Sequence, residues 1–88
     1  MKVEFKKSFV KDLEQLEFAS VKKRVKEVIE LAERARNLQD LKNIRKLRGG
    51  ERYYRIRLGD YRVGLALEDD TLIFVRLLHR KDLYRYFP

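Results

Sequence analysis

The second half of the chain carries arginines at alternate positions, a spacing that suits the binding of anions. Arg55 and Arg57 flank one apolar residue, and Arg62 follows after a Gly59-Asp60 pair. Guanidinium groups stay charged at neutral pH and bind phosphate or carboxylate oxygens through paired hydrogen bonds. The same run includes Arg52, Arg76, Arg80 and Arg85. We interpret the arginines as an anion-binding site; alternatively they extend into solvent or pair with glutamates of another chain.

Period-two alternation predicts three strands that would hold these arginines. Residues 54–58 alternate apolar and cationic side chains, as expected of a half-buried strand. Gly59-Asp60 suits a two-residue hairpin turn that leads into a second strand over residues 61–67. We expect Glu68-Asp69-Asp70 to form a three-residue turn and residues 71–78 to form the third strand.

These turns fix which arginines face one another. The first turn places Arg57 directly opposite Arg62 and Arg55 opposite Gly64, and the second places Arg62 opposite Arg76. Like charges directly opposite each other destabilise a sheet. We therefore expect an anion over the row of three guanidinium groups, with Gly64 leaving room for that ligand to approach.

The first half predicts a short strand over residues 2–5 and two helices. Ser8 and Ser20 are the expected N-caps of these helices. The apolar positions of the first helix are Phe9, Leu13 and Leu16, and those of the second are Val21, Val25, Val28, Ile29 and Ala32. We interpret the second stripe as a face of the core rather than a partner-binding groove. Residues 37–50 read as a connector ending at two glycines.

The predicted order is β-α-α-β-β-β followed by a short C-terminal segment. This order implies an α+β fold, an antiparallel sheet with the two N-terminal helices packed on one face. A chain of 88 residues with 44% hydrophobic residues has material for one core, so we expect a single domain over residues 1–88. The tail from residue 80 to 88 has room for one or two helical turns.

Composition narrows the chemistry that these elements can perform. Lysine and arginine number 22 against 14 acidic residues, so the net charge is +8 and the expected partners are polyanions. The absence of cysteine and the single histidine argue against thiolate chemistry and the common metal motifs, and Gly49-Gly50 lacks the residues of a phosphate-binding P-loop. No apolar run suggests a secretory signal or a membrane span. We expect a cytoplasmic protein that uses no metal or other cofactor and does not bind membranes.

Three sequence blocks carry a resemblance to a known family. They are KLRG at residues 46–49, YRIRLGDYRV at residues 54–63 and HRKDLY at residues 79–84. In this order and spacing the blocks resemble the RelE/ParE superfamily of toxins, and the resemblance covers essentially the whole chain. It implies the RelE-like fold and, for the RelE-like branch, an endoribonuclease that cleaves mRNA on the ribosome and is neutralised by an acidic antitoxin.

The resemblance also implies residue roles. Arginines on the central strands, an arginine before the C-terminal segment and a terminal tyrosine would form the catalytic set: Arg57, Arg62, Arg80 and either Tyr84 or Tyr86. The remaining candidates, expected to contact RNA, are Lys46, Arg48, Arg55, Arg76 and His79. The chain departs from the family pattern in having arginine at strand positions where one RelE type has lysine, and Leu78 where glycine is usual.

The general base is not determined by the sequence. Arginine does not accept a proton near neutral pH, whereas histidine can. Adjacent strand residues point to opposite faces, so His79 meets Arg80 only if the strand has already ended there.

Two other functions stay open. One is a ParE-like inhibitor of DNA gyrase, which needs no catalytic set; the other is a module that binds its antitoxin but has lost catalysis.

Overall fold

The computed structural model describes all residues from Met1 to Pro88. In chain order the elements are β1 (Lys2–Phe5), α1 (Lys7–Gln15), α2 (Ala19–Arg34), the 3-10 turn η1 (Leu38–Asp40), β2 (Ile44–Lys46), β3 (Tyr53–Leu58), β4 (Tyr61–Glu68), β5 (Thr71–His79) and α3 (Leu83–Tyr86). The strands form one sheet in the order β1-β5-β4-β3-β2. The α+β class is thereby confirmed.

Two features of the sheet differ from the prediction. The connector contains the additional strand β2, which pairs with β3. A strand of three residues is too short to show a readable alternation. The first strand, β1, is parallel to β5, whereas every other pair is antiparallel. The chain between these two strands contains both helices and β2 to β4, so it is long enough for the connection that a parallel pair requires.

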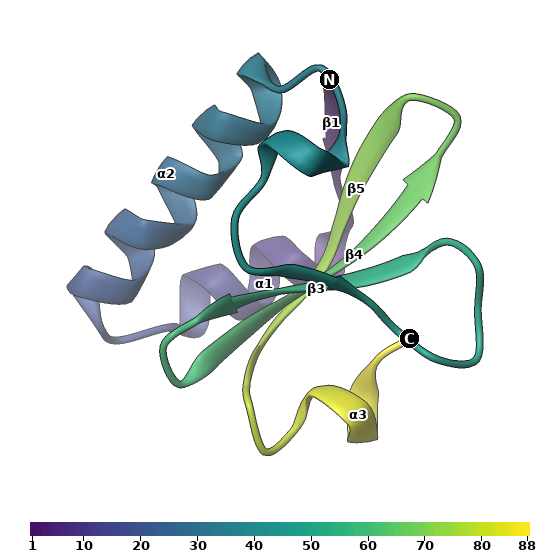
Figure 1. Ribbon diagram of the computed structural model, residues 1–88. Helices are drawn as coiled ribbons and strands as arrows, with labels where there is room; N and C mark the ends of the chain where they lie inside the picture. The colour runs from purple at the N-terminus through teal and green to yellow at the C-terminus, as the bar shows by residue number, and fades with distance from the viewer.

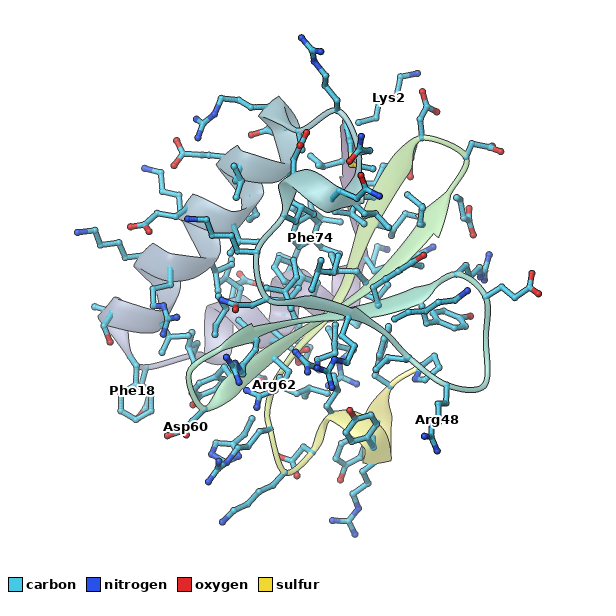
Figure 2. All side chains as sticks on the ribbon, viewed as in Figure 1. Lys2, Phe18, Arg48, Asp60, Arg62 and Phe74 are labelled. Atoms are coloured by element: carbon cyan, nitrogen blue, oxygen red, sulfur yellow. The ribbon has the colours of Figure 1, made fainter.

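The sheet separates two groups of helices (Figure 1). The helices α1 and α2 lie on one side and α3 lies on the other. The main core fills the first side, where Val25 and Ala32 of α2 are buried and the rest of the predicted stripe is half-buried against them. This confirms the stripe as a core face. Phe74 of β5 is fully buried here, between α2 and the strands in Figure 2.

The predicted helix caps are wrong. The first helix begins at Lys7, and the hydroxyl of Ser8 donates a hydrogen bond across to the carbonyl of Val75 (2.6 Å). The second begins at Ala19, so Ser20 lies inside its first turn. Neither N-terminus has a side-chain cap, which shows that packing of the apolar faces holds both helices in place.

The β4–β5 connection also differs from the prediction. Glu68 pairs with Thr71, so the turn has two residues, and Asp69 adopts the left-handed conformation that such a turn requires (φ 54°). A bulge between Gly64 and Leu65 then shifts the register by one residue. Arg62 consequently lies opposite Leu78, and Arg76 lies opposite Gly64.

The helix α1 closes the edge of β5 beyond the reach of β1. Asp12 accepts hydrogen bonds from the backbone N–H of Leu77 (2.9 Å) and from Nε and Nη2 of Arg76 (2.8 and 3.1 Å). This carboxylate accepts hydrogen bonds from an otherwise unpaired strand amide and from a half-buried guanidinium. It therefore contributes more to the stability of the fold than a surface ion pair does. None of the helices has the length and apolar character needed to cross a membrane.

We expect Asp12→Ala to lower the free energy of unfolding by about 2 kcal/mol, because the charged hydrogen bonds of Arg76 and one strand amide lose their acceptor. Urea unfolding followed by circular dichroism would measure the loss. Glu14→Ala removes an exposed carboxylate from the same helix and serves as the control. Equal stabilities of the two variants would contradict the prediction.

Candidate functional site

The β3–β4 hairpin brings together the arginines that the sequence singles out. Arg57 lies directly opposite Arg62, and Arg55 lies opposite Gly64, as the two-residue turn predicts. Arg80 follows β5, and its backbone N–H donates to the carbonyl of Asp60 in the same turn (2.7 Å). Figure 2 shows Arg62 on the side of the sheet that carries α3. We call Arg55, Arg57, Arg62 and Arg80 the arginine cluster.

Arg62 is the best fixed member of the cluster. Its Nη1 donates to the carbonyls of Gly59 (2.6 Å) and Tyr61 (2.9 Å). The pKa of Arg62 is lowered below its ordinary value. Partial burial is the larger cause, and repulsion from the other three members of the cluster is the smaller one. The other three cations are therefore close enough to disfavour the charge on Arg62.

The cluster has little compensation from the protein itself. Its one ion pair joins Arg80 Nε to Asp60 Oδ1 at 3.9 Å, and both side chains are more than half exposed. A contact of this kind contributes little. An anion with several oxygens would therefore relieve the repulsion, and the arrangement is suited to phosphate or to a group of carboxylates.

The two terminal tyrosines have different neighbours. Tyr84 belongs to α3, on the same side of the sheet as Arg62 (Figure 2), and it slightly raises the pKa of that guanidinium. Its side chain is 74% exposed. The ring of Tyr86 lies instead between Arg85 and Arg76, with Cζ atoms 5.7 and 6.0 Å from the ring centroid. Tyr86 is therefore engaged by two arginines outside the cluster, whereas Tyr84 is free on the surface of α3.

Three predicted RNA contacts lie apart from the cluster. Arg76 is half-buried in its ion pair with Asp12, whose hydrogen bond raises the pKa of that guanidinium. Lys46 pairs with Tyr54, one position off the Arg45–Arg55 pair, and so points to the opposite face of the sheet. Arg48 is exposed in the loop before β3, well away from Arg62 in Figure 2.

His79 also lies on the opposite face of the sheet. It pairs with Tyr61, and the two rings meet edge to face with centroids 5.7 Å apart. Its Nδ1 accepts the backbone N–H of Lys81 (3.2 Å). The strand ends at His79, whose ring packs on Tyr61, whereas the Arg80 side chain reaches Asp60 in the β3–β4 turn. The cluster consists of cations alone, and no group of acidic or histidine side chains forms a potential metal site.

Gly64 serves a different purpose from the one predicted. A Cβ atom at this position would lie 2.8 Å from the ring of Phe87, so the glycine makes room for the chain's own C-terminus rather than for a ligand. Phe87 is buried with Leu47 and Leu83, and its ring meets that of Tyr53 edge to face at 5.6 Å. This contact anchors α3, and with it Tyr84, over the sheet.

Sequence reasoning missed Arg45. The strand β2 places it directly opposite Arg55, on the face of the arginine cluster. Asn43, immediately before β2, adopts a left-handed conformation (φ 60°). Asparagine is one of the few residues that does so readily, and it was the available sign of a turn and a new strand at this point.

Comparison with known proteins shows similarity along the whole chain. Residues 3–84 match the family described as "ParE toxin of type II toxin-antitoxin system, parDE". The chain is 49% identical over 89 residues to Toxin RelE3 of Methanocaldococcus jannaschii, with complete coverage of both sequences. The crystal structure of a RelB-RelE antitoxin-toxin complex from Methanococcus jannaschii matches with a TM-score of 0.81 and 46% identity, covering 97% of this chain and 99% of that one. A RelE-RelB complex from Pyrococcus horikoshii matches with a TM-score of 0.73 and 28% identity, covering 93% and 97%.

Proposed function

This chain belongs to the RelE/ParE superfamily of toxins of type II toxin–antitoxin systems, and on that premise we propose that it is a ribosome-dependent endoribonuclease that cleaves mRNA and so inhibits translation. The observation that carries the proposal is the arginine cluster, built on the β3–β4 hairpin on the side of the sheet where α3 presents the exposed Tyr84 (Figure 2). A toxin that acts only by binding another protein has no need to hold four guanidinium groups against their mutual repulsion. The ribosome places the reaction in the cytoplasm.

The proposed reaction is an in-line attack of the RNA 2′-hydroxyl on the adjacent phosphorus. The new bond closes a 2′,3′-cyclic phosphate, and the broken bond releases a 5′-hydroxyl. Arg57, Arg62 and Arg80 stabilise the negative charge that develops on the phosphate oxygens. The phenol of Tyr84 can give a proton to the departing 5′ oxygen. Because the cluster contains no proton acceptor, the 2′-hydroxyl proton passes to water.

We propose that an acidic antitoxin covers the arginine cluster when RNA is absent. Two of the similar structures are complexes with an antitoxin called RelB. Guanidinium groups bind carboxylates and phosphates through the same forked geometry, so an acidic segment on the cluster would exclude RNA. The net charge of +8 should also accelerate this association at low salt.

Expression of the chain without an antitoxin, followed by primer extension on a reporter mRNA, tests the nuclease proposal. We expect cuts in the translated mRNA and none in the same mRNA without a ribosome-binding site. The new ends should carry a 5′-hydroxyl and a 2′,3′-cyclic phosphate. Cleavage should need no divalent ion beyond those that keep the ribosome intact. A toxic protein that leaves translated mRNA uncut would contradict the proposal.

The match to the ParE toxin family over residues 3–84 favours a second candidate, inhibition of DNA gyrase. In that case the same cultures should stop DNA replication and induce the SOS response while translated mRNA remains whole. Following DNA synthesis and mRNA integrity in one induced culture separates the two candidates. A nuclease cuts the mRNA before DNA synthesis stops, whereas a gyrase inhibitor stops DNA synthesis first.

A further inference from the structure

A small polar cavity lies where the edge strand β2 meets β3. Its volume is about 130 Å³, and it is lined by Asn43, Ile44, Arg45, Arg55 and Arg57. None of these three arginines forms an ion pair with a carboxylate of the chain. The cavity is therefore a concave surface that concentrates positive charge and lacks an internal counter-ion.

The register of the strands places like charges together at this cavity. Arg45 lies directly opposite Arg55, and Arg57 lies two positions further along β3 on the same face. Directly opposed like charges destabilise a sheet unless something else offsets the repulsion. The Arg45–Arg55 row adjoins the Arg57–Arg62 row, so the positive surface continues from the cavity into the arginine cluster.

The backbone at Asn43 orients two of the three arginines. Its left-handed conformation (φ 60°) turns the carbonyl so that it accepts the backbone N–H of Arg57 (3.1 Å) and Nη1 of Arg55 (3.3 Å). Left-handed backbone outside glycine costs free energy and is concentrated at functional sites. Here the unusual conformation has a specific result, because it holds the side chain of Arg55 at the cavity.

We infer that this cavity binds a second phosphate of the RNA backbone, next to the phosphate that is cleaved, and that Arg45 is a residue of this subsite. Same-face residues of a strand are about 7 Å apart, which is close to the distance between neighbouring phosphates of a stretched single strand. The two arginine rows would then take successive phosphates. The nature of the substrate rests on the proposed function, but binding of a single-stranded RNA can be measured without cleavage.

The first test measures the affinity of a 2′-O-methyl RNA oligonucleotide, which cannot be cleaved, by fluorescence anisotropy over a series of salt concentrations. We expect Arg45→Ala to weaken binding about tenfold at low salt, as the loss of one charged hydrogen bond would. The slope of log K against log salt should fall by about 0.7, the value for one phosphate of a single strand. Lys23→Ala removes an equally exposed cation from α2 and should change neither quantity.

The second test replaces one phosphate at a time with a neutral methylphosphonate. We expect one linkage at which the replacement weakens binding to the native protein and does not weaken binding to Arg45→Ala further, because both changes remove the same contact. Undetectable binding, equal effects of Arg45→Ala and Lys23→Ala, or equal effects at every linkage would overturn the inference. A poly-glutamate peptide serves as a second ligand. If Arg45→Ala weakens binding of this peptide and not of the RNA, the inference is also overturned, and the cavity is assigned to an acidic protein. If the subsite is found and translated mRNA still remains uncut, the phosphate-binding role of Arg45 stands and the nuclease proposal fails.

Discussion

Arg62→Ala should lower the rate of mRNA cleavage by about 10²–10³-fold, the usual cost of removing one well-placed donor to a transition-state oxyanion. Arg62 is the member of the arginine cluster with two backbone carbonyls fixing its guanidinium, and it sits on a central strand between β3 and β5. Donors that are held in place before the reaction stabilise developing charge without reorganising. Primer extension after timed induction, or single-turnover cleavage on programmed ribosomes, would measure the rate.

The same substitution should leave the isolated protein at least as stable, with a melting temperature higher by a few degrees. Burial and the other arginines lower the pKa of Arg62, so folding disfavours its charged form. That cost applies at every pH below the lowered pKa, and it disappears only when the guanidinium loses its proton. The gain from Arg62→Ala should therefore be constant between about pH 5 and pH 9, where arginine is charged in both states.

Lys23→Ala again serves as the control, because it removes one exposed charge from α2, on the other side of the sheet (Figure 1), and should change neither the rate nor the melting temperature. Inorganic phosphate should stabilise the native protein more than Arg62→Ala, since ligands stabilise the state that binds them. Full activity in Arg62→Ala would remove this residue from the mechanism. A lower melting temperature would show that its two backbone hydrogen bonds outweigh the repulsion.

The parts of the structure that the sequence predicts correctly are those encoded by local patterns. A Gly-Asp pair between two alternating segments allows essentially one hairpin register, and so the Arg57–Arg62 pair could be placed before the structure was known. The stripe of α2 had the helical period of a buried face, and it lies against the main core. Three members of the arginine cluster, Arg55, Arg57 and Arg62, come from this hairpin.

The wrong assignments depend on contacts between distant residues. Asp12 and Arg76 are 64 positions apart, and no local pattern shows that this arginine is already paired. The three consecutive acidic residues between β4 and β5 did not define the length of that turn. The bulge beside Gly64 then changed the register of the two strands further. A small residue in a strand indicates a close approach without identifying the group that approaches. Here that group is Phe87, 23 residues later in the chain.

Gly64→Ala should lower the cleavage rate by about 10–100-fold, because it should displace the segment that carries Tyr84. The added methyl group would lie 2.8 Å from the ring of Phe87, closer than side-chain carbons approach in real proteins. That ring is only 3% exposed and is held by Leu47, Leu83 and Tyr53, so it cannot simply swing away. The helix α3 must shift instead, while the sheet can keep its shape because the backbone φ of Gly64 is not positive.

The substitution should also destabilise the protein by about 1–3 kcal/mol, as overpacking usually does, so the rate needs a control of similar stability. Val25→Ala provides it, since Val25 is buried in α2 on the other side of the sheet. Both variants are assayed well below their melting temperatures. The double variant Gly64→Ala/Phe87→Leu restores space for the methyl group and should recover part of the rate, because changes at two residues in contact are not additive. If Val25→Ala slows cleavage as much as Gly64→Ala, the effect comes from stability alone, and the contact between Gly64 and Phe87 does not position Tyr84.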